Sequence, residues 1–231
     1  TALLIATPSA ALGQARPAAS YTEKMTPDKL RFRALYEELV ETNTTLSVGS
    51  CTDAAQIIAR HLRSAGYPDE DVRIIVAPDQ EKKGNLVARL RGTNPDMQPM
   101  LLLAHLDVVE ADPEDWERDP FTLFEENNFF YGRGAADDKS MVAIFVDSMI
   151  RYREEGFQPQ RDIKMALTCG EETSYDFNGI RYLLENYRDL IDAEFALNEN
   201  GNGILDENGE RVGLLLQAGQ KVSQTFELEV I

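Results

Sequence analysis

Apolar residues recur along the chain with two spacings, one typical of helices and one typical of strands. Helical spacing follows two helix-start sequences, Thr26-Pro27 and Ser50-Cys51-Thr52, and it returns twice later in the chain. The predicted helices begin near residues 27 and 51 and cover 138–154 and 180–186. The predicted strands are 72–76, 86–90, 100–104, 162–168 and 194–197, then a hairpin of 204–205 and 212–216 about Asn208-Gly209. Strands that alternate with helices predict a layered α/β fold.

The helical spacing also predicts which side chains face the core. In the second helix, His61 shares an apolar stripe with Ala54, Ile57, Ile58 and Leu62, so we expect it to pack rather than to bind a metal. In the helix 138–154, the side chains expected to point inward are Met141, Ile144, Phe145, Ser148 and Met149.

The two ends of the chain differ from its middle. Residues 1–15 are apolar and uncharged but shorter than the ~20 residues of a membrane span, and they are typical of the end of a secretory signal. The alternative is a disordered leader. We therefore expect 1–20 to be a signal remnant or leader, and the protein to be periplasmic or secreted, where Cys51 and Cys169 could pair. Residues 220–231 alternate as a strand and are expected to continue into a further domain of a longer protein.

Charge and composition exclude several classes of protein. The 231 residues include 23 Lys+Arg and 40 Asp+Glu, a formal net charge of −17, which argues against nucleic-acid partners and an anionic membrane surface. Two cysteines are too few for a disulfide scaffold. Two histidines exclude any site of three imidazoles, so a metal site in these residues must consist mostly of carboxylates.

Acidic and imidazole groups gather where the predicted strands end. His105 and Asp107 follow the strand 100–104, and alternate strand residues share a face, so the two can meet. Asp137-Asp138 follows a glycine-rich segment and precedes the long helix, Glu171-Glu172 follows the strand 162–168, and Glu199 follows 194–197. Each signal alone is modest, since a strand-end His, a helix cap or a solvated loop would explain it.

Taken together, these groups describe a cluster of carboxylates about one imidazole. Such a cluster repels itself unless cations neutralise it. Oxygen-rich ligation with one His suits zinc, with cobalt or manganese as alternatives.

These motifs resemble those of the M20 family of zinc metallopeptidases and amidohydrolases, and most closely its carboxypeptidase S-like branch. Their order and spacing agree from about residue 27 to 225. The matching stretches are Gly84-Asn85-Leu86, 101–109, 116–121, 131–139, Gly170-Glu171-Glu172 and Leu197-Asn198-Glu199. The resemblance implies a mixed central sheet flanked by helices, with 21–219 as the catalytic domain and 220–231 as the first strand of a lid or dimerisation domain.

The resemblance also implies a role for each site residue. His105 and Glu199 would bind one zinc ion and Glu172 the other. Asp137 would bridge the two ions, with the peptide bond after it cis. Asp107 would orient His105. Glu171 would be the general base that takes a proton from a metal-bound water, which then attacks the amide bond of a peptide or N-acyl amino acid.

The sequence departs from the family pattern in three respects. Ser140 replaces a usual Gly, a change we expect to be tolerated. The family's second zinc takes a His from far downstream, and these 231 residues hold no such His. Most of the lid is also absent, so we expect this chain alone to be nearly inactive. A homodimer formed through the lid remains open.

Three alternatives remain. The protein could be a non-catalytic ligand-binding protein on the same scaffold. It could be an N-acyl-amino-acid deacylase rather than a peptidase. A plain acidic α/β domain would need all four motifs to coincide by accident.

Overall fold

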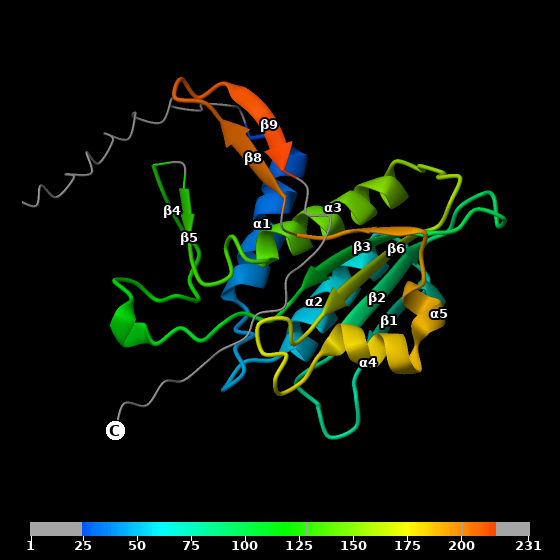
Figure 1. Ribbon diagram of the computed structural model, residues 1–231, viewed down its shortest axis with the longest axis horizontal. Helices are drawn as coiled ribbons and strands as arrows, with labels where there is room; N and C mark the ends of the chain where they lie inside the picture. Colours follow the sequence, from blue (N-terminus) through cyan, green and yellow to red (C-terminus); the bar gives the residue numbers. More distant parts are fainter. Residues whose placement is uncertain (1–24, 128, 200, 216–231) are drawn as a thin grey trace, which may run out of the picture.

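A five-stranded sheet forms the centre of the computed structural model, which describes residues 25–127, 129–199 and 201–215 (Figure 1). Its strands, in spatial order, are β1 (Val72–Ile75), β2 (Asn85–Leu90), β6 (Ile163–Thr168), β3 (Met100–His105) and β7 (Phe195–Leu197). β1, β2 and β6 pair antiparallel, whereas β6, β3 and β7 run parallel. The sheet is therefore mixed, as the resemblance implies.

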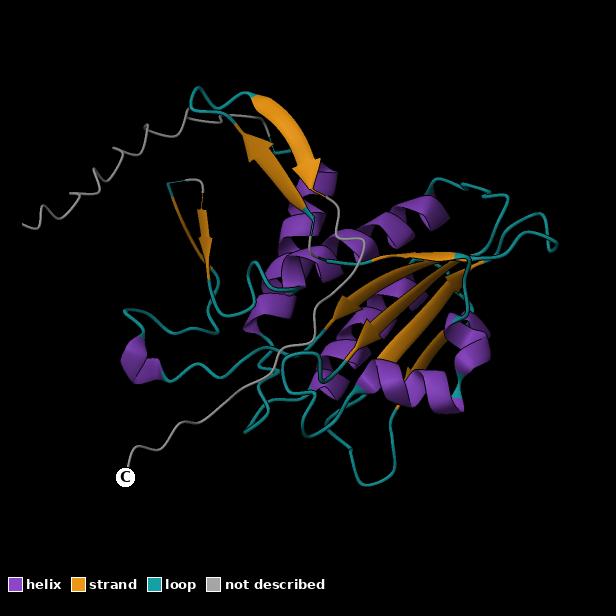
Figure 2. Ribbon diagram, in the orientation of Figure 1, coloured by secondary structure: helices purple, strands orange, loops and turns teal. Residues whose placement is uncertain are grey.

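Helices cover both faces of this sheet and complete a three-layer α/β fold (Figure 2). One face packs against α2 (Cys51–Ser64) and α3 (Lys139–Glu154), and α1 (Pro27–Glu41) packs beside α3. The buried side chains of these three helices belong to the larger core cluster. The opposite face packs against α4 (Gly179–Asn186) and α5 (Arg188–Ile191) around Leu183 and Ile191. Every residue of the central strand β6 is buried, which explains its continuous apolar run. The predicted layered α/β fold is thus confirmed.

The helix starts follow the sequence signals. The Thr26 hydroxyl accepts a hydrogen bond from the N–H of Lys29, and the Ser50 hydroxyl accepts one from the N–H of Asp53. These bonds satisfy backbone donors that the first helical turn leaves without a partner.

The predicted inward face of α3 is partly wrong. Met149 is buried, but Ile144 is 51% exposed. The buried stripe is Val142, Ala143, Val146, Met149 and Ile150. Two overlapping apolar stripes run along this helix, and the sequence pattern alone does not decide which of them meets the sheet.

Two small hairpins lie outside the main sheet. The predicted hairpin about Asn208-Gly209 is present as β8 (Asn202–Leu205) and β9 (Arg211–Leu215). β4 (Phe124–Glu126) and β5 (Phe129–Tyr131) form a second hairpin, too short to leave a periodic signal. Short 3-10 turns occupy Asp69–Asp71 and Pro113–Asp115. The leader expected at 1–20 and the strand expected at 220–231 lie outside the described residues.

The parallel half of the sheet determines where the strand-end residues meet. β3 pairs with β6 so that His105 lies opposite Thr168, and Met100 pairs with Phe195 of β7. The carboxyl ends of β3, β6 and β7 therefore meet at one edge, which is where ligands bind in many α/β sheets. Among the described residues, no helix is both long and apolar enough to cross a membrane.

Candidate metal centre

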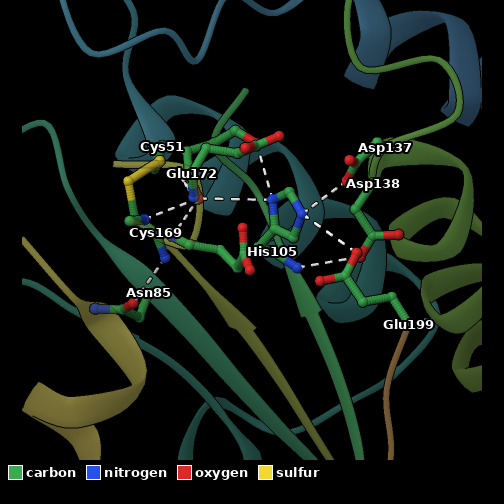
Figure 3. A network of polar contacts seen from close by, with 11 residues as sticks. Cys51, Asn85, His105, Asp137, Asp138, Cys169, Glu172 and Glu199 are labelled. Carbon is green, nitrogen blue, oxygen red and sulfur yellow. Dashed lines mark hydrogen bonds and ion pairs between the residues drawn. A yellow bond between two sulfur atoms is a disulfide. The ribbon is translucent and has the colours of Figure 1, made fainter. Parts of the chain in front are cut away.

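His105 lies at the centre of the strand-end cluster and is almost fully buried, with 3% of its surface exposed. Its Nε2 is 2.9 Å from an Asp137 carboxylate oxygen and 3.6 Å from one of Glu199 (Figure 3). Its Nδ1 is 2.9 Å from the backbone oxygen of Asp107. Since a carbonyl oxygen only accepts, this contact places a proton on Nδ1 and leaves Nε2 free to bind a metal from the open side of the ring.

The Asp107 side chain has a different set of partners from the one the resemblance implies. Its carboxylate lies 3.7 Å from Nδ1 of His105, whereas its own backbone carbonyl makes the close contact. The carboxylate instead accepts three consecutive backbone N–H groups, from Gly170 at 2.8 Å, Glu171 at 3.2 Å and Glu172 at 3.0 Å. One buried residue thus connects the imidazole to the loop that bears both glutamates.

The chain turns sharply where β6 leads into this loop. Gly170 has φ +90°, and a Cβ there would lie 2.0 Å from the backbone oxygen of Phe177, so only glycine fits. Cys169, just before it, forms a disulfide with Cys51 at the start of α2, with a Cα–Cα distance of 6.0 Å. The sequence left this pairing open.

Asp137 and Asp138 have opposite environments despite being adjacent. The peptide bond between them is cis, as the resemblance implies. The Asp137 side chain is 64% exposed and faces Nε2 of His105, whereas Asp138 is buried and accepts the backbone N–H of His105 at 3.3 Å. Burial raises the pKa of Asp138 to about 7. The sequence motifs assigned Asp138 no role of its own, and adjacency to Asp137 was the only signal.

Electrostatics at the cluster favours a bound cation. Burial, followed by the charge of Asp137, raises the pKa of Glu172 above its ordinary value, and burial likewise raises the pKa of Glu199. Burial lowers the pKa of His105, but neighbouring carboxylates, Asp107 foremost, outweigh this and leave it raised. In the part of the chain that the structure describes, His105 is the only ion-pair partner of Asp137 and of Glu199.

Two groups of potential ligands share His105. One contains Asp137 and Glu199 and the other contains Glu171 and Glu172, with the ligand atoms of each group within 4.8 Å of one another. An imidazole nitrogen and carboxylate oxygens at this spacing suit zinc or a similar divalent ion. All the predicted metal-ligand positions are therefore brought to one place.

Two other places are excluded as metal sites. Cys51, Cys169 and Asp107 also lie close together, but the sulfurs form a disulfide and the carboxylate accepts backbone N–H groups. His61, expected to pack, is only partly buried and lies with Nε2 2.7 Å from a Glu38 carboxylate oxygen, away from the cluster.

The fold and this cluster together define a candidate metal-dependent hydrolase. The model of Peptidase family M20/M25/M40 matches residues 101–229, and the chain belongs to this family. The family match includes every residue of the cluster.

The chain is similar to parts of two curated enzymes. It is 34% identical over 125 residues to the mouse N-fatty-acyl-amino acid synthase/hydrolase PM20D1, covering 54% of this chain and 25% of that one. It is 36% identical over 118 residues to the succinyl-diaminopimelate desuccinylase of Delftia acidovorans, covering 51% and 30%. The matched region is thus about a quarter to a third of the length of these relatives.

Solved structures of the same fold include two peptidases. The di-peptidase Dug1p from Saccharomyces cerevisiae has a TM-score of 0.59 at 20% identity, covering 77% of this chain and 39% of that chain. The M20 family metallo-carboxypeptidase Sso-CP2 from Sulfolobus solfataricus has a TM-score of 0.60 at 20% identity, covering 80% and 39%. At this identity the likeness shows the fold.

Proposed function

We propose that this protein is a metal-dependent hydrolase of peptide or N-acyl amide bonds. The observation that supports this most directly is the convergence of one buried imidazole and four carboxylates at the edge of the sheet where the parallel strands end. The relatives above support the same class of reaction, because their names describe the hydrolysis of acyl-amino acids or desuccinylation.

The cluster would contribute ligands to two zinc ions in the arrangement that the family resemblance implies, although these 231 residues hold no downstream histidine for the second ion. His105 and Glu199 would hold one ion and Glu172 the other, with Asp137 between them. The positions of Asp137 and Glu199 on Nε2 of His105 support the first group. Bound zinc would polarise the substrate carbonyl and lower the pKa of a bound water. Cobalt and manganese remain alternatives.

Glu171 is the proposed general base. Its backbone N–H donates a hydrogen bond to the Asp107 carboxylate. The residue lines a cavity of about 270 Å³ together with His105 and Glu199. From there its carboxylate would take a proton from the attacking water and return it to the leaving amine. The bond to Asp107 fixes the backbone from which the Glu171 side chain projects, so the carboxylate begins from a fixed position beside the cavity.

The proposed substrates are peptides and N-acyl amino acids, of which the deacylase activity is the alternative that the curated relatives favour. We further propose that the protein is exported to the periplasm or secreted. The apolar, uncharged residues 1–15 and the buried disulfide support this location, since disulfides persist in oxidising compartments.

The variant Glu171→Gln, made in the full-length gene product, tests the proposal. We expect it to retain metal and to lose nearly all hydrolysis in a panel of dipeptides, C-terminally varied peptides and N-acyl amino acids. Glu117→Gln, which changes an exposed glutamate elsewhere, is the control and should match the wild type. Binding of these compounds without hydrolysis by the metal-loaded wild type would instead support a binding protein.

A further inference from the structure

Asn85 belongs to a matched motif, Gly84-Asn85-Leu86, to which the sequence assigned no role. It is the first residue of β2, and its surface is 0% exposed. Its side-chain oxygen accepts the backbone N–H of Cys169 at 3.0 Å, and its side-chain nitrogen donates to the backbone oxygen of Ile75 at 3.3 Å. The two partners, one a donor and one an acceptor, determine the orientation of the amide.

The Asn85 side chain accepts the first backbone N–H beyond the end of β6, where the pairing with β2 stops. The last pair between β2 and β6 is Leu86 with Leu167, and β6 itself ends at Thr168. The Asn85 oxygen accepts the next N–H group beyond the strand, that of Cys169. The loop with Glu171 and Glu172 therefore begins from a backbone position that a buried hydrogen bond fixes.

Gly179, the first residue of α4, packs closely against Asn85. A Cβ on Gly179 would lie 2.0 Å from the Asn85 side-chain oxygen and 2.6 Å from the backbone oxygen of Cys169. The Gly179 N–H donates to that same Cys169 oxygen at 2.8 Å. Both backbone polar groups of Cys169 are thus bound, and the start of α4 closes over them.

Gly84 extends this arrangement to α2. Its N–H donates to the Thr52 hydroxyl at 2.8 Å, and Thr52 follows Cys51, the disulfide partner of Cys169. The start of β2, the start of α2 and the end of β6 are consequently joined in a closed ring. Figure 3 shows Asn85 and the disulfide on opposite sides of Cys169, to the left of His105.

We propose that Asn85 is a positioning residue for the catalytic loop: through the N–H of Cys169 it fixes the backbone from which Glu171 and Glu172 project. It touches neither the cluster nor the cavity, and it acts only through Cys169. This inference rests on the proposed function of those two glutamates.

Two variants of the same shape separate positioning from simple packing. Asn85→Leu removes both hydrogen bonds and leaves the Cys169 N–H buried without an acceptor. Asn85→Asp also loses the donor to Ile75 but keeps an oxygen that can accept from Cys169. Asn186→Leu is the matched control, because Asn186 also donates to a backbone oxygen, that of Tyr182, on the exposed side of α4.

The first readout is hydrogen exchange of the metal-free protein, which requires no activity. Asn85→Leu should speed exchange of the N–H groups of 169–172, whereas Asn85→Asp and Asn186→Leu should leave them close to wild type. The second readout is kinetics of the full-length gene product. We expect Asn85→Leu to lower kcat by about 10- to 100-fold, as for a catalytic group displaced by about 1 Å, with KM unchanged.

The rank order of the variants decides the inference. Wild-type exchange and kcat in Asn85→Leu would overturn it. Equal impairment in Asn85→Leu and Asn85→Asp would also overturn it, because the bond to Ile75 is the loss they share. If the leucine variant does not fold, Asn85→Ala gives the same comparison. A wild type that hydrolyses no amide while the exchange pattern holds would contradict the proposed function but support the positioning role.

Discussion

The two sides of the candidate metal centre are built in different ways. On one side of His105, the loop with Glu171 and Glu172 donates three backbone N–H groups to the Asp107 carboxylate. The disulfide of Cys169 also holds this loop. On the other side, Asp137 is 64% exposed. Glu199 follows β7, a strand of three exposed residues with three pairs to β3. Figure 3 shows these two sides to the left and right of the imidazole.

This difference indicates what each side requires. The loop side has its geometry fixed by backbone hydrogen bonds and a covalent bond, so it is preorganised without a ligand. On the opposite side, carboxylates approach one imidazole and repel one another. A cation would therefore contribute most to order on the side of Asp137 and Glu199.

The largest effect is expected from breaking the loop side at Asp107. Asp107→Ala leaves three consecutive N–H groups without their acceptor, so the free energy of unfolding should fall by about 3–5 kcal/mol and hydrolysis should be lost. Denaturant unfolding of the metal-free protein measures the first effect. Asp119→Ala is the control, since Asp119 also accepts a backbone N–H, that of Phe121, but at the exposed surface. Equal losses in the two variants would contradict the account.

A smaller effect is expected from removing the metal. Stripping zinc with a chelator should speed hydrogen exchange around 137–138 and 195–199 by more than it does around 169–172, because the loop keeps its own bonds. Exchange mass spectrometry with and without zinc measures both segments in one sample. Uniform loosening of the two sides would show that the loop is not preorganised.

The smallest effect concerns the pH at which metal is released. Burial raises the pKa of Glu172 and Glu199 above the ordinary 4.5, and the pKa of His105 is also raised. Each shift lets protons compete with the metal at a higher pH, so zinc should be retained at pH 8 and lost as the pH falls toward these raised values. A zinc titration against pH checks this. An apparent zinc affinity that stays constant from pH 8 down to pH 4.5 would contradict the assigned directions.

The sequence predicted the parts of this molecule that depend on residue type and period. Apolar runs located β2, β3 and β6, and the polar residues that end them include His105 and Glu171. Parallel pairing then brings these ends together, which is a general property of α/β sheets.

The contacts of single polar groups could not be predicted in the same way. The Asp107 carboxylate binds backbone N–H groups more than sixty residues away, and backbone donors leave no trace in the sequence. Asn85 binds Cys169 across a similar distance. The predicted buried face of α3 was wrong for another reason, since Ile144 and Val146 lie on competing apolar stripes.

Metal bound per chain tests the central claim most directly. The wild type, His105→Ala and His61→Ala would be equilibrated with zinc, desalted and analysed for metal. His61 is the matched control, because it is the other histidine in the chain and pairs with Glu38. The account predicts that the wild type and His61→Ala retain zinc and that His105→Ala loses it. Equal zinc in all three proteins would contradict a metal centre at His105.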